Sequence, residues 1–87
     1  MTALERIFEA IEAKTKELGY NLSPVPNNVR TFGEGLRNLS PGIWEGLYHD
    51  PVKGLLVLLV NTSDLTIHVQ MFKQHQNFII PPQDWVT

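Results

Sequence analysis

The clearest alternation of apolar and polar positions lies at the start of the chain. Five apolar residues and Thr15 recur there at spacings of three and four residues: Leu4, Ile7, Phe8, Ile11, Thr15 and Leu18. This spacing places them on one face of an α-helix. Thr2 and Glu5 are spaced as a capping box, and Gly19 stands where a left-handed residue often ends a helix. The sequence therefore predicts an amphipathic helix over residues 2–18.

Residues 43–80 carry patterns typical of β-strands. Leu65–Phe72 alternates apolar and polar side chains, which predicts a strand with one buried face. Ile43–His49 ends at a turn signal, and the polar stretch 61–64 has the length of a hairpin loop. Phe78–Ile80 predicts a short last strand before two prolines.

Together these segments predict one small α+β domain over residues 1–87. Its amphipathic N-terminal helix packs on an antiparallel β-meander of three to four strands formed by residues 43–80, and residues 81–87 form a tail. The short loops between the strands favour neighbours that pair antiparallel.

The segment 20–42 lacks a regular pattern and contains three prolines. An irregular stretch of this length is uncommon inside a small domain. Two interpretations remain open: the segment is a functional loop, or it hides a short strand near Val29–Phe32. A short helical turn around Glu34–Leu39 is compatible with both.

The run Gly54–Val60 is apolar on both faces of the predicted strand. One face carries Leu55, Val57 and Leu59, and the other carries Leu56, Leu58 and Val60. A single helix covers one of these faces, and each large apolar side chain left in water forgoes about 1.5–3 kcal/mol of burial free energy. An exposed patch of this kind usually marks an interface.

We expect this interface to involve Leu56, Leu58 and Val60, with the odd-numbered face of the same strand as the alternative. In a further alternative, segment 20–42 and the C-terminal tail cover the second face within the same chain. Trp85 either anchors a partner or pins the tail to the core.

Composition favours the partner interpretation. The 87 residues include no cysteine, 43% are hydrophobic and 18% are charged, below the typical charged share of about 25%. Residues 51–87 carry only 4 charged side chains in 37 positions. A chain this small that lacks disulfides and carries excess apolar surface is expected to form a homo-oligomer.

Charge argues against several partner classes. The chain has 7 basic and 9 acidic residues, and the basic residues are scattered along it. We therefore expect no nucleic-acid partner and no polybasic membrane anchor. The apolar run Leu55–Val60 is far shorter than the ~20 residues of a membrane span. Charges interrupt the N-terminal apolar positions, so no signal peptide is expected and the predicted location is the cytoplasm.

Few residues are arranged for catalysis or metal binding. His49, His68 and His75 lack the close spacing that would place two imidazoles on one metal. No serine stands in a nucleophile motif. We therefore expect neither a metal nor a cofactor, and no enzymatic activity.

The most suggestive local group is Arg30, Gly33, Gly35 and Arg37. Backbone N–H groups flanked by glycines, together with two guanidiniums, suit an anion or a carboxylate. The structural alternative is a turn-rich loop with solvated arginines.

The sequence thus predicts a small non-enzymatic protein–protein interaction module of the inhibitor, immunity or adaptor type. It would act through an apolar sheet face and self-associate. The alternative is a small-molecule or anion-binding module that uses the Arg30–Arg37 loop.

Overall fold

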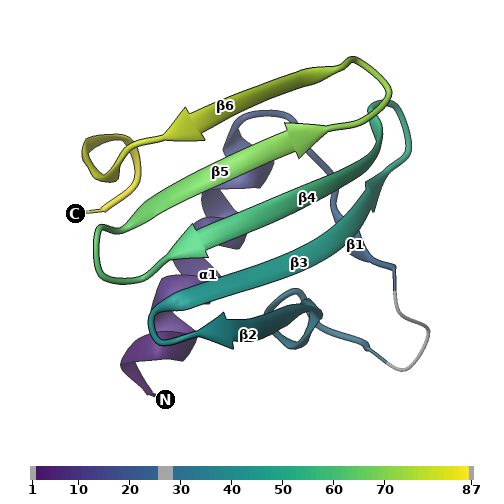
Figure 1. The fold of residues 1–87 in the computed structure, drawn as a ribbon. Helices are drawn as coiled ribbons and strands as arrows, with labels where there is room; N and C mark the ends of the chain where they lie inside the picture. Colours follow the sequence, from purple (N-terminus) through teal and green to yellow (C-terminus); the bar gives the residue numbers. More distant parts are fainter. Residues whose placement is uncertain (1, 26–28, 87) are drawn as a thin grey trace.

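Helix α1 (Ala3–Glu17) lies across one face of an antiparallel sheet in the computed structural model, which describes residues 2–25 and 29–86 (Figure 1). Its predicted ends are confirmed within one residue. The Glu5 backbone N–H donates to Thr2 Oγ1 at 3.1 Å, and Gly19 follows the helix with a φ of +93°. The helix buries Phe8, Ile11 and Thr15 against the sheet. In the described part of the chain, no helix is long and apolar enough to cross a membrane.

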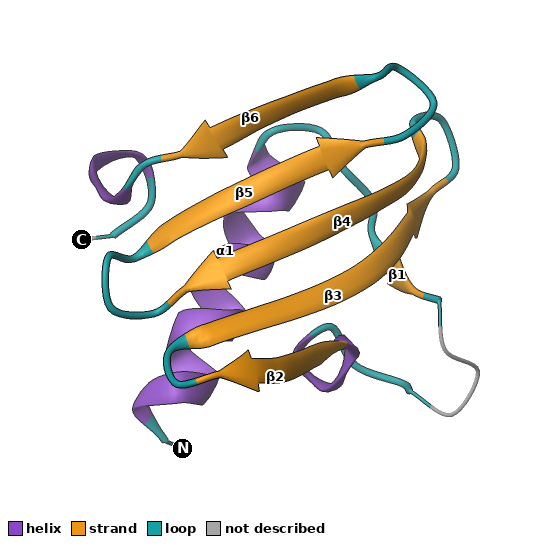
Figure 2. Ribbon diagram, in the orientation of Figure 1, coloured by secondary structure: helices purple, strands orange, loops and turns teal. Residues whose placement is uncertain are grey.

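The sheet is a meander with two additional short strands at one edge (Figure 2). Four consecutive strands pair antiparallel: β3 (Ile43–Asp50), β4 (Gly54–Asn61), β5 (Thr66–Met71) and β6 (Gln76–Ile80). The other two, β1 (Ser23–Pro24) and β2 (Leu36–Ser40), both pair with the free side of β3. The α+β class is therefore as predicted.

The predicted number of three to four strands is too low, because the described residues form six. Segment 20–42 supplies the two extra strands, although its residues 26–28 lie outside the described residues. The hidden strand is Leu36–Ser40 and not Val29–Phe32, and the helical turn is only the 3₁₀ turn η1 (Gly33–Gly35). Leu36 is the single buried side chain of β2, so this strand has no alternation to reveal it. Its pairing with β3 defines it instead.

The core lies between α1 and the even-numbered side of β4. Leu56, Leu58 and Val60 are fully buried there. The register pairs them with the inward residues of β5, for example Leu58 with Val69. The prediction that Leu56, Leu58 and Val60 form an exposed interface is therefore wrong, because these side chains are the core that α1 covers.

Tyr48 ties segment 20–42 to the sheet. Its side chain is fully buried, and its hydroxyl donates a 2.6 Å hydrogen bond to the Phe32 carbonyl oxygen. The two rings stack with centroids 4.7 Å apart. Burial raises the pKa of the Tyr48 hydroxyl above its usual value, and the Glu12 carboxylate adds to the shift. Gly46 and Gly35 leave the space that this ring occupies.

Substituting Gly46 with alanine should therefore destabilise the fold. The added Cβ would lie 2.5 Å from Tyr48 Cε2 and 2.8 Å from the Gly35 carbonyl oxygen. We expect a loss of about 1–3 kcal/mol in the free energy of unfolding, measured by urea denaturation. Gly33→Ala is the matched control, because its Cβ would meet Phe8 at an ordinary 3.4 Å. Equal losses in the two variants would contradict this account.

Candidate functional site

The candidate site is the open face, defined here as the sheet side opposite α1 (Figures 1 and 2). In an antiparallel sheet covered on one side, outward positions are usually polar. Here they include apolar side chains on three strands. Three of them are 36%, 44% and 54% exposed, namely Leu47, Leu55 and Ile79. The part-buried Val57 and Leu59 lie between them on β4. No described element covers this face.

Strand register arranges the centre of the open face in two rows that run across the sheet, and Leu55 lies outside them, opposite His49. The first row holds Arg37, Glu45, Leu59, His68 and Ile79. The second row holds Leu47, Val57, Gln70 and Asn77. Between the rows is a shallow hollow of 170 Å³, lined mainly by Val57, Leu59 and the polar side chains around them. The open face therefore has an apolar centre with polar neighbours.

The open face is nearly neutral. Arg37 Nη2 lies 3.6 Å from Glu45 Oε1, so the guanidinium and the carboxylate form an ion pair at the β2 side. Both side chains are exposed, and such pairs add little stability. Leu59 lies between Glu45 and His68 in the strand register, which separates the carboxylate from the imidazole. This arrangement supplies no acid–base pair in hydrogen-bond contact.

Residues 2–25 and 29–86 contain no group of three or more histidine, aspartate or glutamate side chains placed to hold a metal ion. The buried carboxylate of Asp50 accepts hydrogen bonds from three backbone N–H groups. Asp50 therefore has a structural explanation for its burial and is not free to act as an acid or base.

The structure does not gather Arg30, Gly33, Gly35 and Arg37 into one site. The two glycines lie together in η1 on the helix side of the sheet, where Gly33 faces Phe8 and Gly35 faces Tyr48. Arg37 pairs with Glu45 on the open face. Arg30 is exposed, and its backbone N–H donates to the Glu34 carboxylate at 3.4 Å. Anion binding by this loop stays a prediction.

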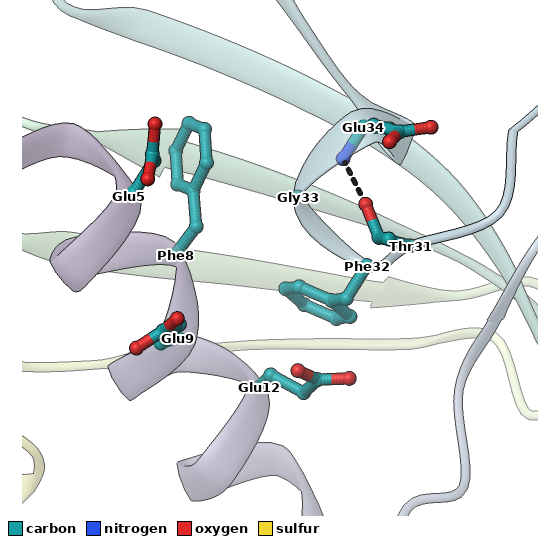
Figure 3. A pocket seen from close by; sticks show the side chains of 8 residues that line it. All are labelled: Glu5, Phe8, Glu9, Glu12, Thr31, Phe32, Gly33 and Glu34. Atoms are coloured by element: carbon teal, nitrogen blue, oxygen red, sulfur yellow. Dashed lines mark hydrogen bonds between the residues drawn. The ribbon is translucent and has the colours of Figure 1, made fainter. Parts of the chain in front are cut away.

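A cleft between α1 and this loop has the opposite charge preference (Figure 3). Its volume is 570 Å³, and Phe8 and Phe32 form its apolar surface. The ionisable side chains that line it are all carboxylates: Glu5, Glu9, Glu12 and Glu34. The Glu34 backbone N–H donates to Thr31 Oγ1, and the Glu34 carboxylate points away from the helix. An anion would meet repulsion here.

Trp85 lies at the helix side and not on the open face. It is half-buried and packs against the core, after the 3₁₀ turn η2 (Pro82–Asp84). The hollow beside it is lined by α1 residues such as Ala10 and Ala13. Its Nε1 is buried and has no hydrogen-bond partner in the described residues. Trp85 therefore holds the tail against the helix and the sheet.

Sequence reasoning missed Leu47 and Ile79, and it gave Leu55, Val57 and Leu59 only as the alternative face. The usable signal was the hairpin register between β4 and β5, which fixes the side of β4 that meets the core.

Comparisons with protein-family models, with curated proteins and with solved structures found no match to this chain. The functional argument therefore rests on the geometry of the open face.

Proposed function

We propose that this chain is a small non-enzymatic interaction protein that self-associates, with the open faces of two copies packed together and the cytoplasm as its setting. The observation that carries the proposal is the apolar outward side of β4, with Leu47 beside it on β3 and Ile79 beyond His68 on β6. No described element covers this face. Packing it against protein recovers burial free energy that water does not provide.

The open face has the size that a weak or moderate dimer needs. Strands in a sheet are about 4.8 Å apart and rise about 3.3 Å per residue. Five strands of about seven residues therefore cover roughly 500 Å² on each copy. Two copies would bury roughly 1,000 Å² in total, the lower limit for a specific interface.

The charge of the open face favours a second copy over a charged partner. Its Arg37–Glu45 ion pair is internally balanced, so the face offers no charge excess for complementary recognition. A complementary partner presents a flat, apolar and neutral surface. The open face of a second copy is such a surface. Two sheets packed face to face lie about 10 Å apart with their side chains interdigitated.

Leu59→Lys tests this proposal, because it places a charge at the centre of the open face while β4 keeps its inward core residues. We expect its average mass, measured by sedimentation velocity at high micromolar concentration, to fall to about half that of the wild type, since an unpaired charge in an interface is strongly unfavourable. Circular dichroism checks that the variant is folded.

Val52→Lys is the matched control for this test. Val52 is 77% exposed in the turn between β3 and β4, away from the open face. The average mass of Val52→Lys should equal that of the wild type at every concentration. A wild-type chain that stays monomeric, or a Leu59→Lys chain with unchanged mass, contradicts the proposal.

A further inference from the structure

No strand in residues 2–25 and 29–86 pairs with the outer edge of β6, and β6 itself carries no charged residue. β6 is the last strand in the sheet order, and its sequence is Gln-Asn-Phe-Ile-Ile. In an antiparallel strand, alternate residues direct their N–H and C=O groups to one side, so an edge strand presents unpaired donors and acceptors. Phe78 is 36% exposed and Ile79 is 54% exposed. They lie on opposite sheet faces, so apolar surface borders this edge on both sides.

The opposite edge of the sheet is protected by several features. It consists of two short strands, β1 and β2, which share the free side of β3. Pro24 in β1 lacks a backbone N–H, and Arg37 places a charge in β2. The register of β2 is also irregular between Asn38 and Ser40. Proteins use prolines, charges, bulges and short strands to prevent edge pairing. β6 is as short as β2, but its five residues include no proline and no charge, and its register with β5 is regular.

We propose that β6 pairs antiparallel with β6 of a second copy, so that the two sheets become one continuous sheet. Full overlap of two five-residue strands about a two-fold axis places Phe78 opposite Phe78 of the other copy. The same register places Asn77 opposite Ile79. Aromatic pairs directly opposite each other on antiparallel strands are favourable.

The lack of charge in β6 is what favours a second copy as the occupant of this edge. Two-fold pairing of identical strands opposes identical side chains at its centre, and like charges there would be destabilising. The central residue Phe78 is apolar, and so are Ile79 and Ile80 after it. Main-chain hydrogen bonds supply the affinity of such an added strand, and these side chains supply the fit.

The edge interface is distinct from the face-to-face contact. A two-fold axis through an antiparallel strand pair stands perpendicular to the sheet, so both open faces end on the same side. The two open faces then join side by side and double the surface available for face-to-face packing. Either interface can exist without the other, so the edge is tested with the face-to-face contact already blocked.

The test uses Leu59→Lys as the parent chain, with a second substitution at Phe78. A wild-type chain that uses both two-fold interfaces would form a tetramer. The parent keeps only its β6 edge and is therefore expected to sediment as a dimer, with half the mass of that tetramer. Adding Phe78→Lys or adding Phe78→Glu should weaken this dimer at least tenfold, since each places like charges directly opposite each other. An equimolar mixture of the two double variants should recover the dimer, because opposite charges then face each other across the axis.

Phe72→Lys in the same parent is the matched control. Phe72 is 46% exposed, comparable to Phe78, but lies in the turn between β5 and β6. The variant that carries Phe72→Lys should dimerise with the same dissociation constant as the parent. A parent that is monomeric at all concentrations overturns the edge proposal, even where the wild type associates through the open face. If the mixture of the two double variants dimerises no more tightly than either variant alone, the proposed register at Phe78 is wrong.

Discussion

Replacing Leu58 with aspartate should unfold the protein, whereas replacing its neighbour Leu59 with aspartate should leave the fold intact. Leu58 is fully buried under α1, between Gly46 and Val69 in the strand register. Removing a buried leucine loses about 2–5 kcal/mol, and a carboxylate buried without a partner adds several more. The total approaches or exceeds the stability of a small domain, about 5 kcal/mol at the lower end.

Leu59 faces the other side of β4 and is partly exposed. Leu59→Asp should therefore lower the free energy of unfolding by only about 1 kcal/mol. Circular dichroism and urea denaturation of the two variants measure the difference. Leu58→Met is the control for packing without charge and should lose less than about 1.5 kcal/mol. A folded Leu58→Asp chain beside an unfolded Leu59→Asp chain would show that the core lies on the other face.

Asp50→Ala is expected to be the next most destabilising change. One carboxylate oxygen accepts from the Asn21 backbone N–H at 2.7 Å, and the other accepts from those of Val52 and Lys53 at 2.8 Å each. These bonds connect the chain after α1 to the β3–β4 turn. Hydrogen bonds to a charged group contribute about 1.5–3 kcal/mol each, but exposed turn donors regain part of this from water. We expect a net loss of about 3 kcal/mol in urea denaturation.

The contribution of Asp50 should depend on pH in a defined direction. The Asn21 and Lys53 backbone N–H groups, helped by that of Val52 and by the Lys53 charge, hold the pKa of the Asp50 carboxyl below its usual value. A lowered folded-state pKa stabilises the protein above the unfolded pKa of about 3.9. This stabilisation disappears as the pH falls through the lower, folded-state pKa.

Asp50→Asn isolates this charge effect. The difference in free energy of unfolding between the wild type and Asp50→Asn should be constant from pH 7 to about pH 5 and then shrink as the pH falls further. Urea denaturation at a series of pH values gives both curves. A difference that stays constant down to pH 2, or grows there, would mean that the Asp50 charge does not stabilise the fold.

The parts of the fold that sequence predicts are those set by local pattern. α1 follows from its apolar spacing and its Thr2 cap, and the β3–β6 meander follows from alternation and turn signals. β2 escapes prediction because only Leu36 is buried in it. Its existence depends on pairing with β3, which is a tertiary contact.

The sequence contains enough information to assign the inward face of β4. Alternation identifies Ile67 and Val69 as inward residues of β5, and the four-residue loop between Asn61 and Thr66 fixes the hairpin register. That register places Leu58 beside Val69 on the core side. The face of one strand was therefore encoded in the alternation of its neighbour and the length of the loop between them.

The Arg30–Arg37 group shows a limit of a different kind. Its members are close in sequence, but η1 lies against α1 while β2 alternates its side chains across the sheet. Arg37 therefore pairs with Glu45 on the open face, whereas Gly33 and Gly35 lie on the helix side of the sheet. Nearness in sequence does not determine which side of a sheet a side chain reaches.

The central claim is that the open face packs against a second copy, and isotope-filtered NMR on a mixture of ¹³C-labelled and unlabelled chains tests it most directly. We expect intermolecular contacts among the methyl groups of Leu47, Val57 and Leu59 at concentrations where the wild-type mass exceeds that of Leu59→Lys. Associated chains with no intermolecular contact at these three residues would contradict the account.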